Sequence, residues 1–181
     1  MTREAERPPE GQGEPLQSRL EPLHPASFAW ALRCCGGDHG EAEDVLQTAY
    51  LEILEGRARY SARSSLKTWF FGVVRRVAAG RGRRRALHSR LLERFAGSAP
   101  SPEPVPDRQR LVEAASDKER LGVALAALPA RQQQLVELVF HHGLSIRESA
   151  DVLGVGLGTA RTHYARAKQQ LLRALGPREG T

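Results

Sequence analysis

The sequence predicts an all-α protein with two small helical domains joined by a flexible, proline-rich linker. Apolar residues recur at spacings of three and four along the chain, as on one face of a helix, and no segment shows the period of two that a strand requires. Four prolines fall between residues 97 and 107, where neither a helix nor a sheet interior would accept them. The chain therefore divides into two helical parts at this point.

The composition around these parts sets the expected boundaries. The first residues are polar and rich in proline, glycine and glutamate, which is typical of a disordered tail. We expect such a tail at 1–20, a first domain at 21–96, the linker at 97–117, a second domain at 118–176 and a short tail at 177–181.

The overall charge and the cysteine content restrict the class of protein. A net charge of +6 and a pI near 10.0 favour a polyanionic partner. An aromatic content of 6% argues against single-strand binding by stacking as the whole function. The two cysteines, Cys34 and Cys35, are adjacent, so they cannot form a disulfide framework and fit small buried residues in a reducing compartment. Without a long apolar run or a signal region, the protein is expected to be cytoplasmic.

Three helices are expected in the first domain. The first covers residues 27–35 and ends at a glycine pair. The second has an apolar stripe with a three-four rhythm, made by Ala42, Val45, Leu46, Ala49, Tyr50, Ile53 and Leu54. A serine-rich loop at 59–65 leads to the third, which contains Trp69, Phe70 and Phe71 and enters an arginine cluster. Because glycine inside a helix costs about 1 kcal/mol, we expect this helix to fray near Gly80.

Four helices are expected in the second domain. One ends before Pro129, which opens the next. Ser145 and Glu148 form a capping box at the start of a third helix, and Gly154 provides a left-handed turn at its end. The fourth helix has a core face made by Ala160, Tyr164, Ala167 and Leu171.

The opposite face of this last helix is basic and carries hydroxyl groups. Its residues are Thr159, Arg161, Thr162, His163, Arg166 and Lys168. A helix-turn-helix with such an outer face on its second helix is suited to the DNA major groove. The alternative is a plain helical hairpin with a solvated face. We favour DNA binding because the capping box, the turn glycine and the one-sided charge occur in the required order.

The first domain has two polar surfaces. Asp44 and Gln47 lie side by side on their helix, with the apolar Leu51 next to them, which fits either a docking face or an ordinary solvated face. A block of arginines on the third helix is opposed locally by Glu93 alone and would neutralise phosphates. Its members are Arg75, Arg76, Arg81, Arg83, Arg84, Arg85, Arg90 and Arg94. Trp69 is the aromatic residue most available to stack on an unpaired base, unless all three neighbouring rings are core.

Catalytic and metal chemistry have no support in the sequence. It contains no nucleophile–base pair or set of metal ligands, so we expect neither an enzyme nor a cofactor. The neighbouring pairs His141–His142 and Cys34–Cys35 are poorly spaced for tetrahedral zinc. Core cysteines and surface histidines explain them better.

Four segments resemble a known family. Residues 42–50 (AEDVLQTAY) and 67–75 (KTWFFGVVR) are similar to helices of bacterial sigma factors. Leu128–Pro129 and residues 144–168 are similar to region 4 of the same proteins. With only regions 2 and 4 and a short linker, the chain resembles the extracytoplasmic-function (ECF, group IV) subfamily of the sigma-70 family. The resemblance covers about three quarters of the chain, with the segments in the family's order.

The resemblance implies a promoter-specificity factor with three surfaces. Asp44, Gln47 and Leu51 would dock on the β′ clamp helices of core RNA polymerase, whose β flap is a further partner. The helix-turn-helix would read the −35 element, with base contacts from Arg161, His163 and Arg166 and phosphate contacts from Thr159 and Lys168. The −10 element would be captured and melted by the loop and the third helix, through Tyr60, Ser61, Ser64, Lys67, Trp69, Arg75, Arg76, Arg83, Arg84 and Arg85.

An anti-sigma factor is a further partner that the resemblance implies, and any membrane tether would arise only through it. Three residues depart from the family pattern: Arg76 replaces a common asparagine, His163 replaces the usual arginine, and Gly156 stands where serine or proline is frequent. The alternative function is a stand-alone helix-turn-helix regulator, which should dimerise on a two-fold site.

Overall fold

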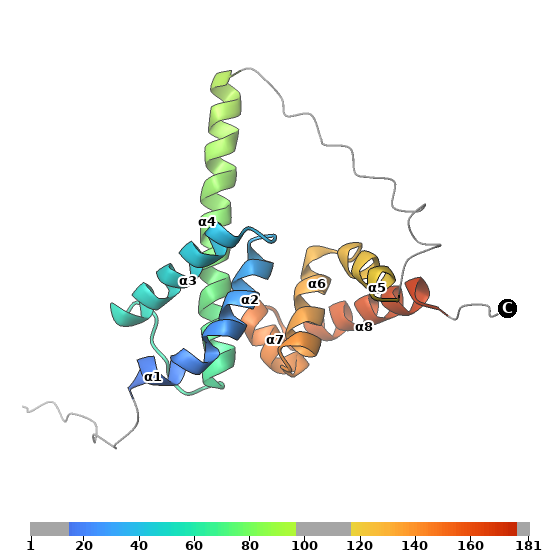
Figure 1. The fold of residues 1–181 in the computed structure, drawn as a ribbon, viewed down its shortest axis with the longest axis horizontal. Coiled ribbons are helices and arrows are strands. Elements are labelled where there is room, and N and C mark those ends of the chain that lie inside the picture. Colours follow the sequence, from blue (N-terminus) through green and yellow to red (C-terminus); the bar gives the residue numbers. More distant parts are fainter. Residues whose placement is uncertain (1–14, 97–116, 177–181) are drawn as a thin grey trace, which may run out of the picture.

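The computed structural model describes residues 15–96 and 117–176, and within them every regular element is helical (Figure 1). The expected all-α fold is therefore confirmed for this part of the chain. The expected linker, apart from its last residue, and both chain ends at 1–14 and 177–181 lie outside the described residues.

The N-terminal half is built around three helices that pack on one another. A short helix, α1 (Leu16–Leu20), and a 3₁₀ turn, η1 (Glu21–Leu23), lead into α2 (His24–Cys34), α3 (His39–Leu54) and the long α4 (Leu66–Ala96). The buried centre holds Trp30, Phe70 and Phe71, all 0% exposed. The Trp30 indole donates a hydrogen bond of 3.1 Å to the Phe71 carbonyl, so the largest core side chain also satisfies its polar atom. The far end of α4 projects beyond the other helices (Figure 1).

The C-terminal half contains α5 (Asp117–Ala126), α6 (Ala130–Val136), a π-helical segment η2 (Glu137–His141), α7 (Ile146–Leu153) and α8 (Leu157–Ala174). Pro129 directly precedes α6, as expected. Ser145 and Glu148 form the predicted capping box, and Gly154 ends α7 with a φ of +61°. Ala160 and Ala167 are fully buried, so the predicted core face of α8 is confirmed and its basic face points outward.

Replacing Ser145 with alanine should destabilise the helix-turn-helix by about 1 kcal/mol, because the capping hydroxyl accepts from the Glu148 amide. Hydrogen bonds from the Ser145 side chain and backbone also lower the pKa of Glu148. The stability that this carboxylate contributes is therefore present above its unfolded pKa and is lost as the pH falls through its lower folded pKa. Urea denaturation at pH 7 and pH 3.5 measures both effects, and the loss should shrink at pH 3.5. Ser89→Ala removes an exposed serine and serves as the control. If Ser145→Ala and Ser89→Ala are equally stable, the predicted contribution of the capping box is contradicted.

Several local expectations are wrong. Residues 16–20 form a helix instead of a tail, and Leu20 is 1% exposed in the core. Leu54 was expected on the buried stripe of α3 but is 60% exposed, because it lies two turns after the exposed Gln47 on the same side of the helix. α4 runs unbroken through Gly80 and Gly82, where fraying was expected. Ion pairs from the following arginines to α3 support the helix at this point.

The two halves share one hydrophobic core. α7 packs against α4, and buried residues of both halves, among them Phe71 and Leu138, belong to a single cluster. His142, expected on the surface with His141, is only 6% exposed at this junction. Cys34 and Cys35 are free and only half-buried. None of the helices in residues 15–96 and 117–176 has the length and hydrophobicity to span a membrane.

Candidate nucleic-acid interface

The predicted docking residues on α3 lie together on its exposed face. The Asp38 side chain caps α3 by accepting a hydrogen bond of 3.0 Å from the Glu41 amide. This cap fixes the residue at which α3 begins and therefore which of its residues face outward. Asp44 and Gln47 are exposed, and the apolar Leu51 is 51% exposed. A large apolar side chain beside two polar ones gives this face the composition of a protein contact.

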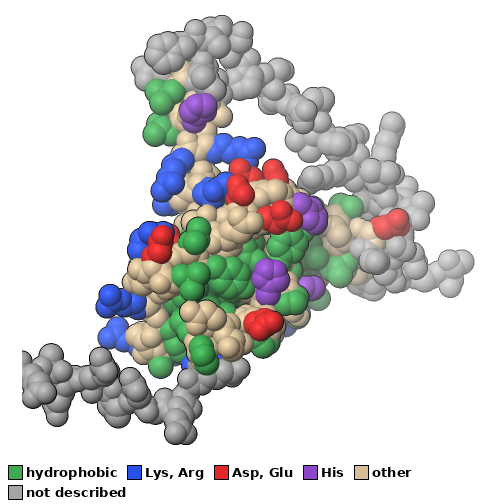
Figure 2. Space-filling view, turned by 60° about the vertical axis from the view of Figure 1, so that its left-hand side comes forward, with side chains coloured by type: hydrophobic (Ala, Val, Ile, Leu, Met, Phe, Trp, Pro, Cys, Tyr) green, Lys and Arg blue, Asp and Glu red, His purple; other side chains and the backbone are tan. Residues whose placement is uncertain are grey.

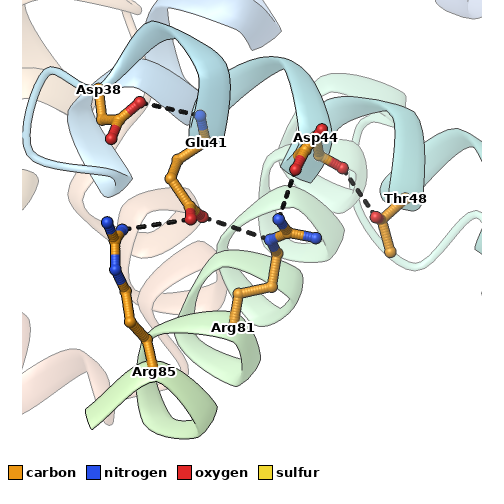
Figure 3. A network of polar contacts seen from close by, with 6 residues as sticks. All are labelled: Asp38, Glu41, Asp44, Thr48, Arg81 and Arg85. Carbon is orange, nitrogen blue, oxygen red and sulfur yellow. Dashed lines mark hydrogen bonds and ion pairs between the residues drawn. The ribbon is translucent and has the colours of Figure 1, made fainter. Parts of the chain in front are cut away.

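An ion-pair network joins this face to α4 (Figure 3). Arg81 donates to the Asp44 carboxylate at 2.6 Å and lies 3.4 Å from the Glu41 carboxylate, which Arg85 also contacts at 3.2 Å. Arg76 pairs with Glu52 at 2.9 Å. Glu93 is the one acidic residue within the arginine block itself, and acidic residues of α3 oppose the block from outside it.

The network contains residues beside the predicted docking face that the sequence reasoning did not select for it. Arg81 donates to both the Glu41 and the Asp44 carboxylates and so holds Asp44 at the boundary between α3 and α4. Each such exposed pair contributes at most about 1 kcal/mol, so its main effect is on side-chain orientation. The signal was present in the spacing: two acids three apart on one helix face two arginines four apart on the next.

A shallow groove of about 330 Å³ adjoins the docking face. It is lined by His24, Phe28, Glu43, Leu46, Gln47 and Tyr50. The His24 ring nitrogen and the Tyr50 hydroxyl lie 3.1 Å apart, and burial raises the pKa of Tyr50. Figure 2 shows hydrophobic side chains in the middle of one face and Lys and Arg side chains along its edge. The α2 residues were missed because nothing in the sequence shows which helix flanks α3.

The serine-rich loop and Trp69 come together at the start of α4. The Tyr60 hydroxyl donates to the Ser64 carbonyl at 2.8 Å, and its ring centroid lies 5.3 Å from that of Trp69. Ser61 is exposed. Phe70 and Phe71 are fully buried whereas Trp69 is half-buried, so the structure confirms that Trp69 is the outermost ring of the three. The loop and the ring form one surface.

The predicted −10 cations have different environments. Arg83 and Arg84 are exposed near the projecting part of α4, and Arg85 is engaged by Glu41. Arg75 is half-buried, and its Nε atom is buried without a hydrogen-bond partner. Lys67 donates to the carbonyl of His142 in the other half of the molecule. The structure therefore does not present all of these cations on one open surface.

The predicted −35 residues lie along one side of α8. Thr159, Arg161, Thr162, Arg166 and Lys168 are exposed, and His163 is half-buried. The Thr162 hydroxyl donates to the Gly158 carbonyl, and Gly156 caps the helix without a side-chain hydrogen bond. The exposed cations and threonines of this helix give it the features of a major-groove reader.

Neither cysteine is poised for chemistry. Burial, followed by the neighbouring Cys35, raises the pKa of the Cys34 thiol to about 12, so the nucleophilic thiolate is disfavoured. Within the two described stretches, 15–96 and 117–176, no three His, Cys, Asp or Glu side chains are grouped to hold a metal ion.

Family models match both halves of the chain. The model of Sigma-70 region 2 matches residues 20–87, and a model of Sigma-70, region 4 matches residues 118–171. The two matches fall on the two halves in the order that the sequence predicts. The α3 face, the loop with Trp69 and most of α4 lie in the first match, and the α8 face lies in the second.

Individual proteins agree with this result. The chain is 30% identical over 162 residues to the probable RNA polymerase sigma-C factor of Mycobacterium bovis, covering 90% of this chain and 84% of that protein. It is 33% identical over 138 residues to the ECF sigma factor SigM of Mycobacterium tuberculosis, covering 75% and 65%. The fold is similar to that of RpoE solved with the anti-sigma factor NepR from Bartonella quintana, with a TM-score of 0.63, 24% identity and coverage of 88% and 95%.

Proposed function

The chain belongs to the extracytoplasmic-function sigma factors of the sigma-70 family, and we propose that three of its surfaces divide the work of promoter-specific initiation. A sigma factor binds core RNA polymerase and directs it to promoter DNA. The observation that supports this division most strongly is that the α3 face and the α8 face are both exposed, one in each matched region.

The α3 face is the proposed polymerase contact. Asp44 and Gln47 supply hydrogen-bond acceptors and donors, and Leu51 supplies apolar area. The adjoining groove lined by Phe28 and Tyr50 extends the apolar part of the surface. A partner that fits this α3 face would be a helical protein segment with a cation that pairs with Asp44. In core polymerase we assign this partner segment to the β′ clamp helices. The C-terminal domain would in turn contact the β flap.

The loop at 60–64 and the start of α4 are the proposed −10 contact. Tyr60, Ser61, Ser64 and Trp69 would hold a flipped base, and Lys67 and the α4 arginines would bind the surrounding phosphates. Flipping a base costs a few kcal/mol, which aromatic stacking and pocket contacts offset. The cations make this contact salt-dependent.

The outward side of α8 is the proposed −35 contact. Arg161, His163 and Arg166 would reach base edges, while Thr159, Thr162 and Lys168 would position the helix through phosphates. His163 is half-buried, so it has the shortest reach of the three base readers.

We further propose that an anti-sigma factor controls the chain, which acts in the cytoplasm where core polymerase is found. The support is family membership and the fold shared with RpoE, which was solved with NepR. No bond-making or bond-breaking step is assigned to the chain itself.

The experiment that tests this function is co-elution of the purified full-length chain with core RNA polymerase in gel filtration. We expect a stable complex with one copy of the chain per polymerase. A chain that stays separate from polymerase yet binds duplex DNA as a dimer would instead be a stand-alone regulator.

A further inference from the structure

The far end of α4 is a helical segment that lies outside the core. Every residue from 82 to 91 is exposed, and the helix continues to Ala96. Within the described residues, the last ion pair between α4 and α3 is that of Arg85 with Glu41. Beyond this pair the helix projects away from α2 and α3 (Figure 1). Since no side chain of 82–91 is buried, packing does not account for this length of helix, and its surface is open to a partner.

The positive charge of this segment is left uncompensated by the rest of the described chain. Residues 82–91 contain four arginines and no acidic residue. Arg85 is paired with α3, but the ion pairs of the described residues include none that involves Arg83, Arg84 or Arg90. The arginine block therefore has a neutralised part beside α3 and an open part on the projecting end.

The three open arginines share one face of the helix. Successive residues of an α-helix are rotated by about 100°, so Arg83, Arg84 and Arg90 lie within about one third of its circumference. Leu87 lies between them on this face and is 60% exposed. A row of guanidinium groups along a straight helix matches a row of phosphates, each of which a guanidinium can bind through two parallel hydrogen bonds. A duplex backbone therefore fits the charge of this face.

Helix length places these arginines relative to the proposed −10 contact at the start of α4. Arg83 is 14 residues after Trp69, and Arg90 is 21 residues after it. At 1.5 Å per residue the separations along the helix are about 21 Å and about 32 Å. For a helix that runs along the DNA, they correspond to about six and about nine base pairs of duplex at 3.4 Å each. With Trp69 at the flipped base, the three arginines therefore lie beside DNA that is well outside the −10 pocket.

The direction of the chain indicates that this DNA is upstream. On the downstream side of the flipped base the strands of a melted promoter are separated, whereas the upstream side remains duplex. From the far end of α4 the chain continues to the C-terminal half, whose α8 is the proposed −35 contact. The open arginines thus come between the two proposed reading surfaces along the chain, as the spacer comes between the two elements along the DNA.

We propose that the projecting end of α4 is a further DNA contact, in which Arg83, Arg84 and Arg90 bind phosphates of the duplex spacer between the −10 and −35 elements. The inference rests on the proposed function, because the position of the contact is measured from the −10 base. Phosphate contacts carry no sequence information, so this contact adds affinity without restricting the spacer sequence. An acidic protein segment would satisfy the same charges, but DNA bound at the start of α4 already lies beside this helix.

The first test is the salt dependence of promoter binding by core polymerase that carries the full-length chain. The probe is a promoter fragment identified by run-off transcription. We expect Arg90→Ala to reduce the slope of log affinity against log salt by about 0.9, which weakens binding about eightfold at about 0.1 M salt. Arg90→Lys keeps the charge and should retain most of the affinity. Arg173→Ala removes an exposed arginine of α8 and should bind the fragment like the wild type.

Neutral phosphates then locate the contact on the DNA. Methylphosphonate groups, which carry no charge, replace the spacer phosphates about six to nine base pairs upstream of the flipped base. We expect them to weaken binding of the wild type and to have little further effect on an Arg83→Ala, Arg90→Ala variant. The same groups at spacer positions next to the −35 element are the control and should affect both proteins equally.

Two results would overturn the spacer contact and leave the sigma-factor function in place. One is an Arg90→Ala variant with the salt slope of the wild type, and the other is an equal loss from the upstream neutral phosphates in wild type and variant. Co-elution with core polymerase should be the same for Arg90→Ala and wild type, and reduced co-elution would mean that the segment contacts protein instead of DNA. A wild type that does not co-elute would contradict the sigma-factor function itself, and the spacer contact with it.

Discussion

Replacing Asp44 and Gln47 together with alanine should weaken binding to core RNA polymerase by about 10- to 100-fold, or about 1.4 to 2.8 kcal/mol. Both side chains are exposed, so their loss removes contacts to the partner without opening the core. The ion pair from Asp44 to Arg81 is exposed as well, so the cost to folding should stay below about 1 kcal/mol. Affinity measured with fluorescently labelled protein and core enzyme gives the result.

Glu21→Ala is the control for this pair. Glu21 is an exposed acidic residue of η1 and belongs neither to the proposed docking face nor to the lining of its groove. It should bind polymerase like the wild type. If the Asp44→Ala, Gln47→Ala variant also binds like the wild type while keeping its melting temperature, the α3 face is ordinary surface.

Replacing Arg161 and Arg166 with alanine should lower transcription from promoters that depend on a −35 element by about 10- to 1,000-fold. Both are exposed on α8, and each good contact to a base edge is worth about 1–3 kcal/mol. Polymerase binding should change by less than about threefold, since the proposed β′ contact lies in the other domain. In vitro transcription measures the loss of promoter activity, and binding to core polymerase measures the change in affinity, both on the same protein preparations.

Arg173→Ala serves as the control, because it removes an exposed arginine from the last turn of the same helix. It should transcribe normally. A loss of polymerase affinity in the Arg161→Ala, Arg166→Ala variant, equal to its loss of transcription, would mean that the α8 face contacts protein instead of DNA.

The sequence predicted those features that depend on residues close together in the chain. The capping box of Ser145 and Glu148, the left-handed turn at Gly154 and the core face of α8 are local patterns, and each is confirmed. The three-four rhythm of α3 identified its buried side correctly except at Leu54, in the last turn. Family membership followed from motifs of this kind.

Features that depend on which helices meet were not predictable in this way. Gly80 was expected to weaken α4, but the ion pairs of Arg81 and Arg85 to α3 act across about forty residues of chain. His142 was expected on the surface because the rings that it packs against, Trp30 and Phe71, are far away in the sequence. The site residues assigned to polymerase and DNA remain predictions for the same reason, since their partners are other molecules.

Run-off transcription on fragments of genomic DNA, with core polymerase and with or without the chain, tests the sigma-factor function most directly. We predict discrete transcripts that appear only when the chain is added and whose start sites share two upstream sequence elements. When the Arg161→Ala, Arg166→Ala variant replaces the wild-type chain, the amount of each of these transcripts should fall. Transcripts that are identical with and without the chain, under conditions where another sigma factor is active, would contradict it.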